Sequence, residues 1–344
     1  MEKKEKIENF DPNGFATITN LFGLPFNYAE SETVVLPVPW EVTVSYSAGT
    51  AEGPEAVEKA SLQVDLYDAF LPDAWKRGIF MLPTDQELSV KSYRFRQMAE
   101  QHISCLEAGE EDPEMLAEIN EACAEMVEWT KMQCRQILAD GKRLALLGGD
   151  HSTPLGYIHA LAEKHQGFGI LQIDAHADLR VAYEGFEYSH ASIMYNALKT
   201  PQVEKLVQVG IRDFCQAENE MIRDSKGRIV TFFDRELKGG KFKGKSWDLQ
   251  CEEIVAALPQ KVYLSFDIDG LDPKLCPNTG TPVAGGFEVE EVLYLLEKLV
   301  HSGREIIGLD LNEVTPGEDE WDANVGARLL YKLCNIMAAS AGKS

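Results

Sequence analysis

The sequence predicts an α/β protein with a central, mainly parallel sheet covered by helices. Two observations support this prediction. Short, near-continuous apolar runs such as RLALLGG and VYLSFDID lack the polar alternation of half-exposed strands, which is typical of parallel strands buried on both faces. Segments with helical patterns separate the runs, and this alternation favours a layered fold. With 344 residues, 44% of them hydrophobic, the chain is long enough for one large domain.

The expected elements follow in order along the chain. Residues 1–32 form an N-terminal extension, and 33–344 form the main domain. Strands are expected at 33–38, 79–83, 143–149, 168–174, 205–211, 262–269 and 305–311. Pro54 suits the first turn of a helix, and further helices are expected at 153–165, 188–199, 287–301 and 323–340. Residues 92–140 are expected to form a helical hairpin whose second helix begins at Asp112-Pro113, with Asp112 as its N-cap.

The composition excludes several classes of protein. The formal net charge of -23 disfavours binding to nucleic acid and to anionic membranes. The seven scattered cysteines include no C-x-x-C pair, which suits free thiols in a reducing cytosol. The charged N-terminus has no signal-peptide core, and no segment is apolar enough to span a bilayer. We therefore expect a cytoplasmic protein that binds neither nucleic acid nor membrane.

Three polar clusters, GGDHS, DAHAD and SFDIDGLDP, follow or end the expected strands. Their candidate metal ligands are His151, Asp174, His176, Asp178, Asp267 and Asp269. The carboxyl ends of parallel strands meet at one edge of a sheet, where ligand sites form. A spacing of two residues puts the ligands within DAHAD, and those within SFDID, on one face of an extended segment. The clusters are therefore expected to meet in the fold.

Four aspartates and two histidines suit a pair of divalent first-row metals. Two such cations balance the four negative charges, whereas one ion would leave buried carboxylates uncompensated. Oxygen and nitrogen ligands without thiolate favour manganese, with nickel, cobalt and iron as alternatives. Each cluster alone has a structural explanation, since GGDH and Asp269-Gly270 are also turn sequences. Their joint occurrence at strand ends indicates a two-metal site, and such a site generally activates a water molecule.

Together these motifs resemble the arginase/agmatinase (ureohydrolase) family, in its agmatinase-like branch. The likeness extends to PVPWEVTVSYSAGTAEGPEAV, LVQVGIRD, NTGTPVAGG and LDLNEVTP, and it covers the chain from about residue 33 onward. The resemblance implies a three-layer α/β/α arginase-like fold with a central, mainly parallel sheet, usually assembled as a homotrimer or homohexamer. Residues 33–344 would form the ureohydrolase catalytic domain, with a helical insertion around 92–140.

The resemblance also implies roles for the metal ligands. Asp174 and Asp267 would bridge two metal ions, manganese in most members of the family and nickel in some. One histidine and one aspartate would complete each coordination sphere, in the pairs His151 with Asp178 and His176 with Asp269.

The resemblance implies His190, Glu313 and Asp178 as catalytic residues. A metal-bridging hydroxide would attack the carbon of a planar, cationic guanidinium. Glu313 would hold the guanidinium through charge-assisted hydrogen bonds, and His190 would protonate the departing nitrogen. The alternatives are that Glu313 is a solvated loop carboxylate and that His190 is only a residue at a helix N-terminus.

Residues outside the ligand set decide which substrate tail fits. Arg180 lies two residues past Asp178, so the same spacing points it toward the mouth of the site. There it would repel the free amine of agmatine and attract a carboxylate, or it would instead pair with Glu184 or Glu187. Aromatic side chains that would either narrow the pocket or only pack are Tyr183, Phe186, Tyr188 and Trp321.

The predicted function is hydrolysis of the C–N bond of a small cationic guanidino compound to urea and an amine or ammonia. Agmatine, guanidinobutyrate and guanidine are the substrate types. The alternatives within the family are a formiminoglutamate hydrolase and an arginase. A binuclear metallophosphoesterase is the alternative from another class, but it would need more histidines and a basic phosphate clamp.

Overall fold

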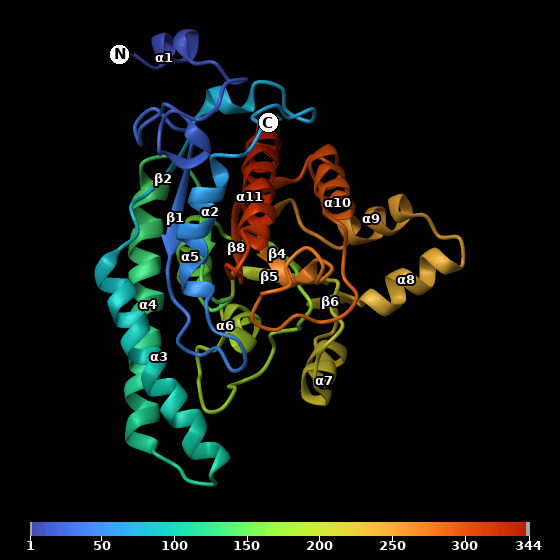
Figure 1. The fold of residues 1–344 in the computed structure, drawn as a ribbon. Coiled ribbons are helices and arrows are strands. Elements are labelled where there is room, and N and C mark those ends of the chain that lie inside the picture. The colour runs from blue at the N-terminus through green and yellow to red at the C-terminus, as the bar shows by residue number, and fades with distance from the viewer. Residues whose placement is uncertain (1, 342–344) are drawn as a thin grey trace.

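The computed structural model describes residues 2–341, and its centre is one eight-stranded sheet (Figure 1). The strand order is β2-β1-β3-β8-β7-β4-β5-β6, and every neighbouring pair is parallel. The strands are β1 (Thr33–Val38), β2 (Ile79–Met81), β3 (Arg143–Gly148), β4 (Phe168–Ile173), β5 (Val203–Val209), β6 (Ile229–Phe232), β7 (Lys261–Asp267) and β8 (Glu305–Asn312). The predicted parallel sheet is confirmed, and each expected strand is present.

Helices cover both faces of the sheet. Successive residues of a strand point to opposite faces, and these strands are apolar at successive positions, so both faces need to be buried. Val35 of β1 packs in one core, whereas its neighbours Val34 and Leu36 pack in the other. The helices are α1 (Lys3–Asn9), α2 (Gly53–Ser61), α3 (Gln86–Glu107), α4 (Pro113–Ala139), α5 (Leu155–Lys164), α6 (Ile193–Leu198), α7 (Gln216–Asp224), α8 (Asp234–Phe242), α9 (Trp247–Ala256), α10 (Val289–His301) and α11 (Trp321–Ser340). Helices α2, α9, α10 and α11 enclose the first core, and α3 to α6 enclose the second. The three-layer α/β/α architecture is confirmed.

The elements between β5 and β7 were not among the sequence predictions. Strand β6 lies at an edge of the sheet and buries fully only Ile229. Helix α7 has nine mostly polar residues, and Glu218 is its one buried residue. Helix α8 contains Gly239 and Gly240, which weaken a helical pattern. Short or polar elements of this kind carry little hydrophobic periodicity.

One local prediction and one unpredicted contact appear in the N-terminal part of the chain. Asp112 caps α4 as expected, since its Oδ1 accepts a hydrogen bond of 2.9 Å from the backbone N–H of Met115. Residues 1–32 include Leu21 and Phe22, which are buried in the first core. The backbone N–H of Phe22 donates to Ser61 Oγ of α2 at 2.8 Å. Across residues 2–341, no helix is both long and apolar enough to cross a membrane.

Four neighbouring strands bring the polar motifs together at one edge of the sheet. Strands β3, β8, β7 and β4 are adjacent, and all their carboxyl ends lie at that edge. Contacts join the segments that follow them. The Glu313 N–H after β8 donates to the Gly149 carbonyl after β3 at 2.9 Å. The Ala175 N–H after β4 donates to Asp269 Oδ1 after β7 at 3.0 Å.

Candidate metal centre

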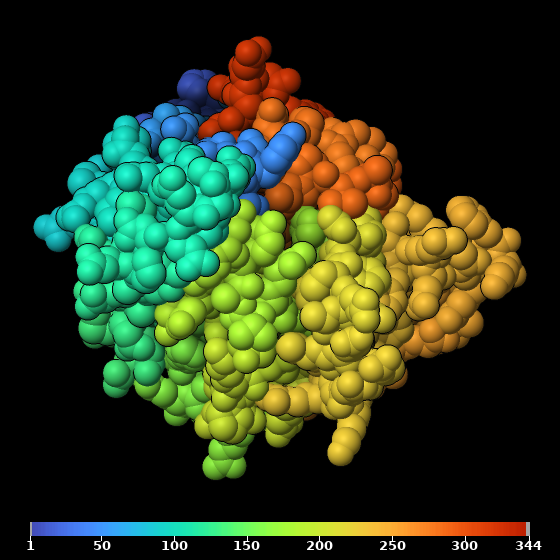
Figure 2. Space-filling model, turned by 90° about the horizontal axis from the view of Figure 1, so that it is seen from below, coloured from blue at the N-terminus to red at the C-terminus, as the bar shows by residue number. Residues whose placement is uncertain are grey.

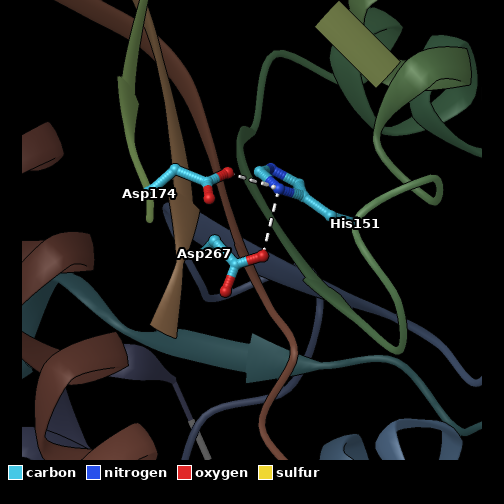
Figure 3. A group of neighbouring side chains, drawn as sticks. All are labelled: His151, Asp174 and Asp267. Carbon is cyan, nitrogen blue, oxygen red and sulfur yellow. Dashed lines mark ion pairs between the residues drawn. The ribbon is translucent and has the colours of Figure 1, made fainter. Parts of the chain in front are cut away.

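His151, Asp174 and Asp267 form a buried group at the centre of this edge (Figure 3). His151 Nδ1 lies 3.0 Å from Asp174 Oδ2 and 3.2 Å from Asp267 Oδ2. Asp178 Oδ2 lies 3.2 Å from the same nitrogen. One imidazole nitrogen cannot satisfy three carboxylates by hydrogen bonding, since it carries at most one proton. The arrangement therefore suits a cation among these atoms.

His176, Asp269 and Asp174 form a second group beside the first. His176 Nδ1 lies 3.0 Å from Asp269 Oδ2 and 3.7 Å from Asp174 Oδ1. Asp174 thus belongs to both groups and turns one carboxylate oxygen toward each histidine. A carboxylate in this position is able to bridge two metal ions.

The polar atoms of the two groups fit divalent cations better than they fit one another. His151 Nδ1 and Asp269 Oδ2 are buried and have no hydrogen-bond partner with acceptable geometry among the described residues. Burial raises the pKa of Asp267 well above its ordinary value, and the charges of Asp269 and Asp174 add to this. Burial alone lowers the pKa of His151, but the surrounding carboxylates outweigh it and raise that pKa. Bound cations would neutralise this crowded charge, so the residues fit the predicted metals.

Outer hydrogen bonds hold two of the candidate ligands in place. His151 Nε2 lies 2.9 Å from Ser265 Oγ, which donates to Asp310 Oδ1 at 3.1 Å. Gln172 Nε2 donates to Asp174 Oδ2 at 2.8 Å. Supports of this kind orient metal ligands and commonly affect metal affinity when they are removed.

Two residues at the edge have a left-handed backbone that is unusual for any residue except glycine. They are Asp178 (φ 53°) and Glu313 (φ 64°). Such conformations disfavour the folded state by about 1 to 3 kcal/mol each and are concentrated at functional sites. The strain is consistent with the functional roles that the sequence predicts for these two residues.

Glu313 lies against the metal-binding edge rather than in solvent. It is 5% exposed, and its Oε1 accepts a 2.8 Å hydrogen bond from the backbone N–H of His151. Its own carbonyl accepts a hydrogen bond from Thr279 Oγ1 at 2.8 Å. Burial raises the pKa of Glu313 well above its usual range, and the charge of Asp267 adds to this. The alternative of a solvated loop carboxylate does not fit this position.

A pocket of about 150 Å³ opens beside the two groups. Its lining includes five residues predicted from the sequence, namely His176, Asp178, Arg180, Tyr183 and His190. The Arg180 guanidinium stacks on the Tyr183 ring at 4.8 Å from the ring centre. The alternative that Arg180 pairs with Glu184 or Glu187 is not seen among the described ion pairs. Burial, followed by the charges of His176 and His151, lowers the pKa of His190 to about 3.

The other predicted aromatic residues lie elsewhere. Trp321 does not line this pocket, is 45% exposed, and donates from its indole N–H to the Lys274 carbonyl at 2.9 Å. Phe186 is fully buried in the second core, and Tyr188 packs against that core. For Phe186 and Tyr188, these contacts therefore favour a role in packing over a role in narrowing the pocket.

Several pocket residues were missed by the sequence analysis. They are Ser45, Ala191, Asp213, Phe214, Glu218 and Thr281. Asp213 directly follows LVQVGIR, so its place after a strand was a usable signal. Both oxygens of Glu218 accept backbone hydrogen bonds, from Leu179 at 3.0 Å and Cys215 at 2.8 Å. The bond with Cys215 belongs to a capping box at the start of α7, whereas nothing in the local sequence indicates the contact with Leu179.

Comparisons with known proteins agree with the fold and the motifs. A model of the arginase family matches residues 31–335. An N(1)-aminopropylagmatine ureohydrolase of Synechocystis is 31% identical over 319 residues, which is 92% of each chain. An agmatinase of Escherichia coli O1:K1 is 28% identical and covers 95% of this chain and 96% of its own.

Solved structures show the same fold at lower identity. The agmatine ureohydrolase of Thermoplasma volcanium superposes with a TM-score of 0.72 at 22% identity, and the match covers 98% of each chain. The proclavaminate amidino hydrolase of Streptomyces clavuligerus gives 0.71 at 20% identity, covering 95% of this chain and 99% of that one. The family resemblance expected from the motifs is therefore confirmed, and the chain belongs to the arginase family.

Proposed function

We propose that this protein hydrolyses a C–N bond of a small guanidino compound and releases urea with an amine or ammonia. The observation that carries the proposal is Asp174, whose two oxygens face two separate histidine–aspartate groups. When bound, a pair of divalent metals supplies an activated water and polarises the electrophile. Membership of the arginase family supports this reaction, as do the names of the relatives, agmatinase and aminopropylagmatine ureohydrolase.

The proposed ligands divide into two sets. His151 and Asp178 would hold one ion, His176 and Asp269 the other, with shared aspartates between them. Asp174 is proposed to bridge on the distances above, and Asp267, which lies beside His151, is the second proposed bridge. Manganese is the proposed metal and nickel the alternative, because the donors are carboxylate and imidazole without thiolate.

Glu313 is proposed to bind the substrate guanidinium. Its carboxylate lies beside the loop that carries His151, so a guanidinium held there would meet the metal ligands at close range. A charge-assisted pair in a buried site orients the reacting carbon and lowers the entropic barrier to attack. The guanidinium charge would also favour the ionised form of this buried carboxylate.

His190 is proposed to pass a proton to the departing nitrogen. It lines the pocket together with His176 and Asp178, so it lies next to the place where the C–N bond would break. An amine is a poor leaving group unless it is protonated. With its pKa lowered to about 3, His190 is neutral near pH 7, so it would first accept a proton from the attacking water and then pass that proton to the nitrogen.

The tail of the substrate is proposed to be short or anionic. Arg180 lines the pocket, and its cation would repel a tail amine such as that of agmatine by up to about 3 kcal/mol at roughly 6 Å. Asp213 and Glu218 oppose this effect, but Asp213 is exposed and Glu218 is engaged by backbone N–H groups. Guanidine and 4-guanidinobutyrate are therefore the favoured candidates.

A substrate panel tests the proposal. Purified protein with Mn(II) or Ni(II) would be assayed with guanidine, 4-guanidinobutyrate, agmatine and arginine for urea, and with formiminoglutamate for its consumption. Urea is expected from at least one guanidino compound and only with metal. Protein that binds two metals yet releases no urea from any of them would contradict the function.

A cytoplasmic homotrimer or homohexamer is proposed as the working assembly, to be checked by light scattering.

A further inference from the structure

The hairpin of α3 and α4 lies beside segments that wall the pocket (Figure 2). In this view the cyan-to-green hairpin borders the yellow-green segment around residues 180–190. We propose that the hairpin is part of substrate recognition, and that Asn120 and Arg96 are positioning residues for two pocket walls. This inference rests on the proposed function, because it assigns a role in binding the same substrate.

The first wall contains a tight two-residue turn. The backbones of Tyr183 and Phe186 pair in both directions, with N–H to carbonyl distances of 3.2 and 2.8 Å. The two central residues have positive φ, 55° at Glu184 and 85° at Gly185. These values are typical of a type I′ turn, which strongly favours glycine. A Cβ on Gly185 would also lie 2.7 Å from Leu116 of α4, so the turn packs directly on the hairpin.

Side chains of the hairpin clamp this turn from both helices. Asn120 Nδ2 donates to the Gly185 carbonyl at 3.1 Å, and its Oδ1 accepts from the Glu187 N–H at 2.9 Å. The amide thus satisfies a carbonyl and an N–H of one segment, as a paired strand would. On α3, His102 Nε2 lies 2.9 Å from the Glu184 carbonyl. Two helices therefore hold three backbone groups in and directly after this turn.

The clamp acts on the pocket through Tyr183. This residue begins the turn, and its ring carries the Arg180 guanidinium at 4.8 Å from the ring centre. Both side chains line the pocket. Holding this turn in place therefore holds the Tyr183 ring. That ring orients Arg180, the cation that is proposed to contact the substrate tail.

The second wall is the loop after β1. Arg96 of α3 donates to the Val42 carbonyl at 3.4 Å and also to the Val44 carbonyl. Ser92, one turn earlier on α3, accepts from the Glu41 N–H at 3.1 Å. Ser45, which directly follows Val44 in this loop, lines the pocket. One hairpin therefore supports both this loop and the turn that carries Tyr183.

Asn120→Ala tests the proposal, with Gln136→Ala as the matched control. Gln136 is also on α4, but its amide bonds only to Asp140 at the end of its own helix. Loss of two hydrogen bonds should raise KM about tenfold, with kcat and bound metal within about twofold of the parent. The ratio of kcat/KM between a tailed substrate and guanidine should also change. Backbone hydrogen exchange of residues 182–188 should speed up at least severalfold, while the control changes none of these quantities.

Two results would overturn the proposal. One is unchanged KM and unchanged exchange in Asn120→Ala. The other is an equal loss of kcat for every substrate together with lost metal, which would indicate a general structural role. A second variant, Arg96→Lys, should raise KM and speed exchange in residues 41–47, and no change there would contradict the role of the second wall. If the parent protein releases no urea, the proposed function has failed, and hydrogen exchange alone still decides whether the hairpin fixes the walls.

Discussion

Replacing Asp174 by Asn should reduce the stabilisation that the protein gains when it binds metal. Asp174 is fully buried and faces both histidine–aspartate groups, so the substitution removes the one negative charge that the two groups share. With metals present, both ions lose a charged ligand. Without metals, burial alone would raise the pKa of Asp174, but His151 and His176 outweigh it and lower that pKa. They so stabilise the carboxylate, and the substitution removes this contribution as well. The informative quantity is therefore the gain in Tm on metal addition, because the loss in the metal-free protein cancels from it.

The expected size follows from binding linkage and from the length of the chain. A ligand present at 100 times its dissociation constant stabilises the folded state by about 2.7 kcal/mol, so two ions contribute about 5 kcal/mol. With 344 residues, the unfolding entropy is about 0.7 kcal/mol per kelvin. The parent protein should therefore gain about 7 °C in Tm when both metals bind. The Asp174→Asn protein should gain less than half of this.

Scanning calorimetry with excess chelator and then with excess Mn(II), alongside elemental analysis, provides the assay. In chelator, Asp174→Asn should unfold below the Tm of the parent, because the carboxylate loses its contacts with His151 and His176. In Mn(II), it should unfold below the parent and contain fewer than two ions. An equal gain in Tm on metal addition, or two ions retained per chain, would refute a bridging role for Asp174.

Three further predictions concern single side chains. Glu313→Gln should keep two metals and lower kcat/KM about 100-fold, because a neutral amide cannot form a charged pair with guanidinium; kinetics near those of the parent would remove Glu313 from the site. Arg180→Met should raise kcat/KM for agmatine relative to 4-guanidinobutyrate by up to about 100-fold, and an unchanged ratio in a substrate competition assay would show that Arg180 does not read the tail. Burial raises the pKa of Cys123 far above its ordinary range, so a thiol reagent at pH 8 should modify the partly exposed Cys105 in the native protein and spare Cys123 until unfolding. Equal labelling of the two thiols, read by mass spectrometry of peptides, would contradict the buried position.

The metal-binding edge was predictable from the sequence because each cluster of ligands ends or closely follows a strongly apolar strand. His151, Asp174 and Asp267 are far apart along the chain, yet a parallel sheet places the ends of β3, β4 and β7 at one edge. The same reasoning placed Arg180 in the pocket. It did not indicate that Arg180 stacks on Tyr183, since that contact depends on the turn that follows.

Contacts between distant polar surfaces were not predictable. Trp321 was expected near the substrate, but it begins α11 and its indole turns to the Lys274 carbonyl outside the pocket. Asn120 lies on a charged helix, where a polar residue is expected to face solvent. Its partners, Gly185 and Glu187, are 65 and 67 positions away in the sequence. Glu218 lies on the short, polar helix α7, and one of its partners, Leu179, is 39 positions away. Local sequence patterns carry no information about such pairings.

The proposed hydrolytic activity depends on two metal ions held by six ligands, which are His151, Asp174, His176, Asp178, Asp267 and Asp269. The most direct test is to titrate metal-free protein with Mn(II) and to measure bound metal and urea release in the same samples. We expect two ions per chain at saturation, with urea release appearing mainly as the second ion binds. Full activity with one ion per chain, or urea release that continues in chelator, would contradict the claim.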